Sequence, residues 1–324
     1  MSNKIWSNDG TYQTIKEVKI DDPSKPIWLR DQDSKKTISL CVGTPVHSEV
    51  SIHYAQCLLE LQKHILKKGD NVSFLMHKSS LVTQGRNLTV ASFLDTEADY
   101  LLFLDSDINI GPDAVYKMIE ADKDVICIPY PLKSIQWAKL YERMQKGKIK
   151  NAEDLETGAC IYPIRIKDST NFTVKNGVAE VTHAPAGCLL IKRIVFDKLI
   201  QNYPNKKIVQ NSVVNGEYQE VPNYYNLFDT VHDEKTQTYM GEDYGFCKLW
   251  TDIGGKIYAL TDKYIMHVGE HQYIGRYMDE FEKADQIISN ISNNGSGGYT
   301  LHAFCVFVTS RVPQEKGAYH ITFT

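Results

Sequence analysis

The run Leu101-Leu102-Phe103-Leu104-Asp105-Ser106-Asp107 decides how the rest of the chain is interpreted. Its apolar part, with Tyr100 before it, predicts a buried strand, and two carboxylates follow where that strand ends. Carboxylates held this close repel each other and lose hydration, so they require a compensating cation. Oxygen ligands of this kind suit Mn²⁺ or Mg²⁺ carrying the phosphates of a substrate. A capped helix start or a solvated turn is the alternative, because Asp-x-Asp also arises by chance.

Strands and helices alternate on both sides of this run. Apolar periodicity predicts strands over residues 37–42, 71–76, 100–104 and 125–129. It predicts helices over residues 48–68, 85–94 and 113–121, the first of which begins at Ser48. Such alternation predicts βαβ units and a mostly parallel sheet, in which ligands bind beyond the carboxyl ends of the strands. Thr44, Asp105 and Tyr130 each follow a predicted strand, so we expect functional groups there.

The pattern is looser after residue 130. It predicts strands over 178–183, 188–192, 256–260 and 264–267, helices over 193–202, 242–253 and 273–289, and a hairpin within 299–324. We therefore expect an irregular arm (1–36), one α/β domain (37–290) whose halves meet between residues 130 and 131, and a linker with a C-terminal extension (291–324).

The composition is that of an ordinary globular protein. The chain has 324 residues, 36 basic and 40 acidic side chains, a formal net charge of −4 and 42% hydrophobic residues, which excludes collagen, coiled coil and general disorder. Its apolar stretches are too short to span a bilayer, and residues 1–25 contain no apolar secretory segment. Seven cysteines without close pairs fit reduced thiols better than disulfides or a zinc site. We expect a cytoplasmic protein, and the sequence does not indicate its oligomeric state.

Short motifs along the chain resemble a known family. Gly43-Thr44-Pro45, Gln84-Gly85-Arg86-Asn87 and Phe103-Leu104-Asp105-Ser106-Asp107 resemble the nucleotide-sugar half of GT-A glycosyltransferases, most of all those of tailed phages and large viruses. Ala186-Gly187, Gly241-Glu242-Asp243 and His267-Val268-Gly269 stand in the order that this superfamily uses, so the resemblance covers residues 37–269. It implies a GT-A (Rossmann-like) sheet with flanking helices. It also implies a hexosyl- or pentosyltransferase, in the host cytoplasm if viral, that takes a nucleotide sugar, with UDP-sugars preferred.

The same resemblance assigns roles to individual residues. It implies a donor site in residues 37–130, with donor contacts from Thr44, Pro45, Arg86, Asn87, Asp105, Ser106 and Gly187. It implies Mn²⁺ or Mg²⁺ held by Asp105, Asp107 and His267, with Asp107 as the direct ligand of choice. The fork of Arg86 suits either a phosphate or an acidic residue that it would orient. Plainer explanations exist for three of these: a satisfied core histidine for His267, an exposed helix-start residue for Arg86 and a turn residue for Gly187.

Glu242 and Asp243 are the implied catalytic pair. In the resembling family the equivalent acids face the donor sugar and the acceptor hydroxyl, and Asp243 is our candidate general base if the enzyme inverts configuration. If the enzyme retains configuration, the carboxylate contacts the sugar instead. Two acids at a helix start also complement the helix dipole, which is the non-catalytic explanation.

The acceptor half, residues 131–290, begins with a basic segment. Residues 133–150 hold six basic side chains against one acidic side chain. Because phage relatives make hydroxymethylated pyrimidines in DNA an attractive acceptor, we expect DNA contacts from Lys133, Trp137, Lys139, Arg143 and Lys146. A solvated basic helix is the alternative explanation, and a glycan or a lipid-linked molecule is the alternative acceptor.

Two other function classes are considered. A nucleotidyltransferase would share the early sheet and the metal carboxylates, but residues 43–47 do not form the Gly-rich basic loop that it needs. A non-enzymatic carbohydrate-binding or virion protein would suit the tyrosines of residues 218–239. Such a protein has no need of paired carboxylates and a distant histidine.

Overall fold

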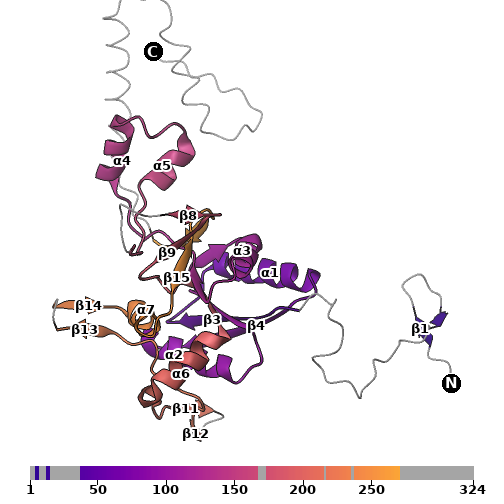
Figure 1. Ribbon diagram of the computed structural model, residues 1–324. Coiled ribbons are helices and arrows are strands. Elements are labelled where there is room, and N and C mark those ends of the chain that lie inside the picture. Colours follow the sequence, from indigo (N-terminus) through magenta and orange to yellow (C-terminus); the bar gives the residue numbers. More distant parts are fainter. Residues whose placement is uncertain are drawn as a thin grey trace, which may run out of the picture. The chain divides into compact units, whose positions relative to one another are not determined.

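The computed structural model describes residues 4–6, 12–14, 37–166, 173–214, 217–234 and 237–270 (Figure 1). The chain divides into two compact units, Met1–Gly269 and Glu270–Thr324. The helix predicted over 273–289, the boundary at residue 290, the linker and the C-terminal hairpin therefore lie outside the described residues. Within the predicted N-terminal arm, β1 (Lys4–Trp6) pairs antiparallel with β2 (Tyr12–Thr14).

The first unit is built on an eight-stranded sheet, with strands in the order β4-β3-β5-β10-β7-β15-β9-β8. Their bounds are β3 (Ser39–Val46), β4 (Asn71–Lys78), β5 (Tyr100–Leu104), β7 (Val125–Cys127), β8 (Val174–Lys175), β9 (Val178–Val181), β10 (Cys188–Lys192) and β15 (Ile257–Leu260). The α/β class predicted from the alternation is confirmed. The sheet is mixed, however, rather than mostly parallel.

The strands β10 and β9 each contribute two antiparallel pairings, and β10 places its two in the middle of the sheet. β10 lies between β5 and β7 and runs antiparallel to both, with Leu190 opposite Leu102 on one side and Ile126 on the other. Parallel pairing is found between β3 and its neighbours β4 and β5, and between β7 and β15. An apolar run predicts a buried strand but not its direction, so the sequence pattern could not reveal this reversal.

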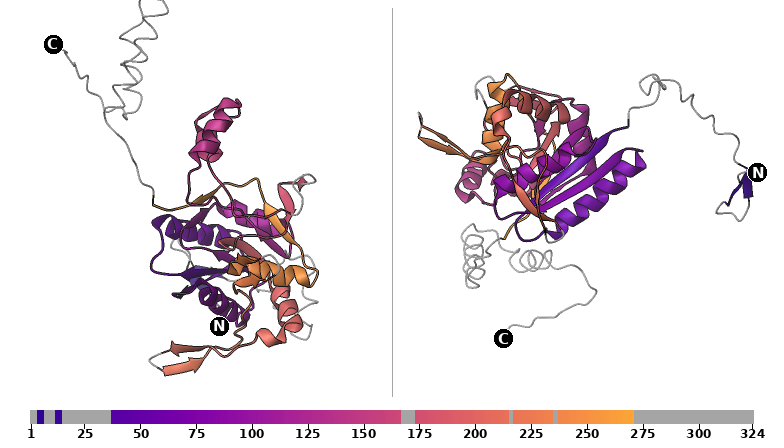
Figure 2. Two further views of the ribbon diagram at one scale, coloured as in Figure 1. Left: turned by 90° about the vertical axis from the view of Figure 1, so that its left-hand side faces the viewer. Right: turned by 90° about the horizontal axis from the view of Figure 1, so that it is seen from below.

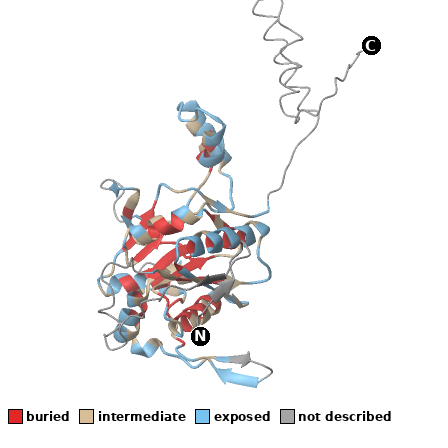
Figure 3. Cartoon of the chain, turned by 90° about the vertical axis from the view of Figure 1, so that its right-hand side faces the viewer, coloured by how far each residue is buried: buried red, intermediate tan, exposed pale blue. Residues whose placement is uncertain are grey.

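Helices cover both faces of the sheet, as the two views of Figure 2 make visible. On one face α2 (Val82–Leu94), α6 (Arg193–Asn202) and α7 (Glu242–Asp252) pack on alternate strand residues such as Phe103 and Leu189. On the other face α1 (Ile52–Lys67) and α3 (Pro112–Glu120) pack on Leu102 and Leu104. The buried residues of both layers are the red segments of Figure 3. The helix α1 begins later than predicted, because Ser51 rather than Ser48 accepts the capping hydrogen bond, from the Tyr54 N–H.

A second, two-stranded sheet lies at the end of β5. It pairs β6 (Ile108–Ile110) antiparallel with β16 (Ile265–His267), with His267 opposite Ile108. The Val268 N–H donates to the Asp107 carbonyl at 2.8 Å and extends this pairing by one step. The turn that carries the two aspartates is thereby joined to a segment near the end of the first unit.

The remaining elements are peripheral. They are α4 (Trp137–Gln145), α5 (Ala152–Gly158), a short 3₁₀ helix (Pro204–Lys206), β11 (Asn211–Val214) paired with β12 (Glu217–Glu220), and β13 (Val231–Asp233) paired with β14 (Thr238–Met240). The six cysteines in the described part of the chain are free thiols, and five of them are buried. Among the helices described, none combines the length and apolar character needed to cross a bilayer.

Candidate active site

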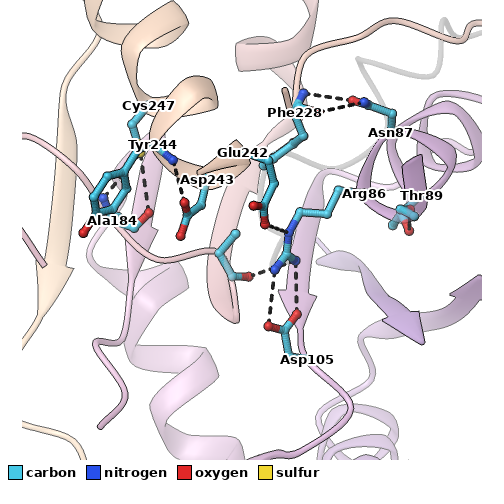
Figure 4. A network of polar contacts seen from close by, with 12 residues as sticks. Arg86, Asn87, Thr89, Asp105, Ala184, Phe228, Glu242, Asp243, Tyr244 and Cys247 are labelled. Atoms are coloured by element: carbon cyan, nitrogen blue, oxygen red, sulfur yellow. Dashed lines mark hydrogen bonds and ion pairs between the residues drawn. The ribbon is translucent and has the colours of Figure 1, made fainter. Parts of the chain in front are cut away.

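The buried guanidinium of Arg86 binds the carboxylates of Asp105 and Glu242, which belong to two separate sequence motifs (Figure 4). Arg86 of α2 donates to Asp105 Oδ1 at 3.1 Å and to Asp105 Oδ2 at 3.2 Å, and its Nε donates to Glu242 Oε1 at 3.0 Å. The Arg86 side chain is 4% exposed, and its guanidinium lies over the ring of Phe103, 5.3 Å from the centroid. The planar fork of arginine matches this bidentate geometry, so Arg86 orients acidic residues and is not an exposed helix-start residue.

Asp105 has a protein partner besides the metal expected for it. The resemblance implied a metal contact for Asp105, and in the structure both of its carboxylate oxygens accept hydrogen bonds from Arg86. Its position follows from the fold, because Asp105 directly follows β5 and its N–H donates to the Gly187 carbonyl at 2.9 Å. Asp105 and Glu242, the first residue of α7, thus lie on either side of one cation.

Asp107 and His267 form a second polar cluster, which the β6–β16 pairing brings together. Asp107 Oδ1 lies 3.5 Å from His267 Nε2, and Asp107 Oδ2 lies 2.5 Å from Lys133 Nζ. The other ring nitrogen of His267, Nδ1, donates to the Pro131 carbonyl at 2.7 Å. Burial disfavours the ionised form of Asp107, but hydrogen bonds and charge from His267 and Lys133 outweigh burial and lower the pKa of this carboxyl to about 2.

The pair Asp107 and His267 fits the protein share of a divalent metal site. Because His267 uses Nδ1 for a backbone carbonyl, its Nε2 is directed at Asp107, an arrangement common for metal-binding histidines. Within the ranges that the structure describes, no group of three His, Cys, Asp or Glu side chains is placed to hold a metal. Substrate phosphates and water would therefore complete the coordination, as they often do for Mg²⁺.

Asp243 differs from its neighbour Glu242 in its surroundings. Its Oδ1 accepts a hydrogen bond from the Tyr244 N–H at 2.8 Å, at the start of α7. Glu242 is 14% exposed and is bound by Arg86. Burial, followed by the negative charge of Glu242, raises the pKa of Asp243 above the usual range of an aspartate. A carboxylate with a raised pKa is a better proton acceptor, so of the two acids Asp243 is better suited to act as a general base.

Tyr130 lies between the two clusters, and its role was not predicted. Its ring meets that of His267 edge to face, with the centroids 5.0 Å apart. Burial, and then the charge of Asp105, raises the pKa of the Tyr130 hydroxyl, and Asp243 acts in the same direction. Gly187 leaves room for this ring, because a Cβ at position 187 would lie 2.6 Å from Tyr130 Cε1 and 2.8 Å from Asp105 Oδ2. Gly187 therefore allows close packing of two side chains, and this accounts for the glycine without a donor contact.

Thr44, Pro45 and Ser106 are three further residues that were predicted to contact the donor. β3 continues to Val46, so Thr44 lies inside the strand and not beyond its end, and its buried hydroxyl pairs with the Tyr54 hydroxyl. Pro45 is half-buried and packs against the helix α2 at Gly85, where an added Cβ would lie 3.0 Å from Pro45 Cβ. The carbonyl of Ser106 accepts a hydrogen bond from the Ser51 N–H at 2.8 Å. Ser106 and Pro45 keep partly exposed surface, whereas Thr44 is buried.

Asn87 fixes a loop and is not exposed to a ligand. Its Oδ1 accepts hydrogen bonds from the N–H groups of Leu227 and Phe228 at 3.1 and 2.9 Å. Its Nδ2 donates to Asn226 Oδ1 and to the Phe228 carbonyl. The side chain is 1% exposed, so the expected donor contact is replaced by a role in positioning residues 226–228.

Three basic side chains of residues 133–150 bind groups in or next to the α4–α5 hairpin. Lys139 Nζ donates to the Cys160 carbonyl at 2.6 Å, Arg143 Nη1 donates to the Gly158 carbonyl at 3.5 Å, and Lys146 pairs with Glu142. Trp137 is 63% exposed and remains accessible. Lys133, by contrast, belongs to the Asp107 cluster. The DNA contacts expected of Lys139, Arg143 and Lys146 would therefore compete with these internal partners.

A large cavity borders His267 on the acceptor half. Its volume is about 960 Å³, and its lining includes His267, Tyr162, Tyr264 and Glu153. The Tyr264 hydroxyl donates to Glu153 Oε1 at 2.7 Å. Tyrosine faces and carboxylates are groups that can bind sugars, by packing against the ring and by accepting hydrogen bonds from hydroxyls.

Comparisons with known proteins complete this description. No protein-family model matches the sequence, and no curated protein matches it. Among solved structures, A197 from STIV matches with 17% identity and a TM-score of 0.39 over 74% of this chain and 97% of that one. A glycosyltransferase involved in the glycosylation of the major capsid of PBCV-1 matches with 10% identity and a TM-score of 0.27, over 52% of this chain and 68% of that one. A UDP-glucose pyrophosphorylase complexed with UDP-glucose matches with 9% identity and a TM-score of 0.34, over 71% of this chain and 92% of that one. At these TM-scores we base no function on the matches and rely on the side-chain geometry.

Proposed function

We propose that the chain is a metal-dependent glycosyltransferase that moves a sugar from a nucleotide sugar to an acceptor hydroxyl. The observation that supports this best is the meeting of Asp107 and His267, 3.5 Å apart although one follows β5 and the other ends β16. Tyr130 packs against His267 of this pair, and Asp243 is a half-buried carboxylate with a raised pKa. A ligand pair for a divalent cation and a separate candidate base are what sugar transfer from a diphosphate requires.

Each group has a distinct task in this proposal. Mn²⁺ or Mg²⁺ held by Asp107 and His267 would stabilise negative charge on the departing diphosphate. Asp243 takes the proton of the acceptor hydroxyl if the reaction inverts configuration, and it contacts the sugar if the reaction retains configuration. Arg86 holds Glu242 and Asp105 in place, so it keeps the wall of the site rigid and does not react.

The donor and the acceptor are assigned only by class. UDP-sugars remain our preferred donors because of the resemblance of the sequence motifs, and Pro45 and Ser106 retain the surface to line a base pocket. For the acceptor we favour a glycan in the cavity beside His267, where Tyr162 and Tyr264 offer flat faces. Hydroxymethylated DNA is the second acceptor that the experiment tests. The exposed ring of Trp137 supports a DNA acceptor, whereas the hydrogen bonds of Lys139 and Arg143 within the protein argue against it.

The test is release of nucleoside diphosphate from a panel of nucleotide sugars with Mn²⁺, by wild type and by Asp107→Ala and Asp243→Asn variants. Asp252→Ala is the matched control, since Asp252 is a surface aspartate paired with Lys248. Oligosaccharides and hydroxymethylcytosine-containing DNA are offered as separate acceptors. We expect turnover by wild type and the control, and loss of turnover in both site variants.

Other outcomes would change the conclusion. Sugar binding without turnover of any donor would favour a carbohydrate-binding protein. Pyrophosphate release from a nucleoside triphosphate and a sugar phosphate would favour a nucleotidyltransferase. Turnover that persists in excess chelator, or in the Asp107→Ala variant, would contradict the metal site.

A further inference from the structure

The ion pair between Lys133 and Asp107 involves the same carboxylate that the proposed function assigns to a metal. Lys133 Nζ lies 2.5 Å from Asp107 Oδ2, while Asp107 Oδ1 faces His267. A divalent cation shared by Asp107 and His267 would use Oδ1, the oxygen that faces His267, and would lie about 2 Å from it. The cation and the ammonium group would then bind the two oxygens of one carboxylate and repel each other, so metal binding weakens the hold of Lys133 on Asp107.

Two features place the Lys133 side chain beside Asp107: the nearby segment at Pro131 and the glycine at position 269. Pro131, two residues earlier, supplies the carbonyl that orients His267, so one short segment supports both partners of Asp107. The stem of Lys133 crosses Gly269, where an added Cβ would lie 2.6 Å from Lys133 Cδ. Position 269 thus leaves a passage for the stem, and the ammonium group is directed to Asp107.

The same lysine is partly exposed to solvent. Its side chain is 40% exposed and that of Asp107 is 32% exposed, so neither group is locked in the core. A lysine ammonium is a mobile point charge on a flexible stem, and it binds phosphate oxygens well. A diphosphate that arrives with the metal would place such oxygens next to Asp107 and offer Lys133 a new partner.

We propose that Lys133 is a diphosphate-binding residue that competes with the divalent cation for Asp107 in the free protein and contacts the diphosphate once the cation has displaced it. This inference rests on the proposed function, because it assumes that a metal and a diphosphate bind at Asp107. It replaces the DNA contact expected of Lys133 from its place in a basic segment. It also explains why a lysine, rather than a neutral residue, lies beside a metal-ligating carboxylate.

The experiment compares wild type with Lys133→Ala, Lys133→Arg and the control Lys117→Ala. Lys117 forms a similar surface pair with Asp262, at 2.7 Å and with 35% and 41% exposure. Mn²⁺ affinity is measured without nucleotide by electron paramagnetic resonance. Affinity for UDP, GDP and inorganic pyrophosphate is measured by calorimetry at saturating Mn²⁺. Circular dichroism and thermal unfolding check that each variant is folded.

Two opposite shifts are expected in Lys133→Ala. Mn²⁺ should bind about 3- to 10-fold more tightly, since the competing ammonium is gone, while the diphosphate that wild type binds should be held about 10-fold or more weakly. Lys133→Arg should restore most of the diphosphate affinity, and Lys117→Ala should match wild type in both measurements. A purely structural lysine would not move the two affinities in opposite directions.

The experiment distinguishes failure of the role proposed for Lys133 from failure of the proposed function. If wild type binds Mn²⁺ and a diphosphate but Lys133→Ala leaves either affinity unchanged, the role of Lys133 is overturned and the proposed function stands. If wild type binds neither Mn²⁺ nor any of the three diphosphates, the proposed function falls and the role of Lys133 falls with it.

Discussion

Replacing Arg86 by methionine should cost the protein a large share of its folding stability. The substitution keeps most of the apolar stem but removes the only charge that both Asp105 and Glu242 are bonded to in the described structure. Those carboxylates are 27% and 14% exposed, so water replaces the lost partner only in part. The variant is left with two partly buried negative charges and no cation between them.

The size of the effect follows from that arrangement. Removing one partner of a buried ion pair typically costs about 3–5 kcal/mol, and we expect the free energy of unfolding of Arg86→Met to fall by this amount. Arg86→Lys keeps the charge but loses the planar fork, so we expect a loss of about 1–3 kcal/mol. Since globular domains are stable by only about 5–15 kcal/mol, the lysine variant keeps the test valid if the methionine variant fails to fold.

The assay is urea unfolding of the full chain at pH 7, followed by circular dichroism and tryptophan fluorescence. Lys256→Ala is the control, because Lys256 and Glu180 form an exposed pair at 2.9 Å, with 61% and 47% exposure. Its loss should leave the free energy of unfolding close to that of wild type. If both Arg86 variants stay within about 1 kcal/mol of wild type, Arg86 does not hold the acidic groups together and the description of the site is wrong.

Three further predictions test other parts of the site. Asp107→Ala should stay folded, because the residue lies beyond a strand end, but should lose Mn²⁺ binding and sugar transfer, measured by paramagnetic resonance and diphosphate release. Asp243→Asn should lower the rate by about 10²–10⁴-fold with little change in donor affinity, and unchanged turnover would exclude Asp243 as the base. Because the folded-state pKa of Asp243 is raised, its ionisation costs stability above that pKa, so Asp243→Asn should be more stable than wild type at pH 7. Urea unfolding should find that this gain disappears as the pH falls below the usual aspartate range. Gly187→Ala should lose about 1–3 kcal/mol in the same assay, because its Cβ would overlap Tyr130 and Asp105, and an unchanged midpoint would contradict that packing.

The sequence was most informative where a local pattern determines the structure. β5, β10 and α6 have the bounds that apolar periodicity predicted, because each is a short apolar or amphipathic run with charged residues or turns at its ends. β3 was predicted too short, since Gly43-Thr44-Pro45 resembles a turn and yet pairs with β4 through Val46. Pairing with a neighbouring strand here overrides local turn propensity.

The candidate site was only partly predictable, because its contacts depend on long-range geometry. Asp107 and His267 were expected together from the order of motifs, and their side chains do face each other. The sequence left the partner of the Arg86 guanidinium open, and only the fold shows that this partner is Asp105. Lys133 lies in a basic stretch of sequence, so nothing local indicated that its ammonium reaches Asp107. Tyr130 was noted as a strand-end residue, but its contact with His267 depends on a strand far along the chain.

The position of β10 has a consequence for how this protein folds during synthesis. β5 and β7 do not pair with each other, and each is bonded along one edge to β10, which is separated from β7 by residues 128–187. Until the ribosome has released that segment, both edges carry unpaired backbone groups that can associate with other chains. A fragment ending near residue 130 would keep these edges permanently open, and we expect it to aggregate rather than to form an independent nucleotide-binding module. The central part of the sheet therefore cannot be completed before β10 has been synthesised.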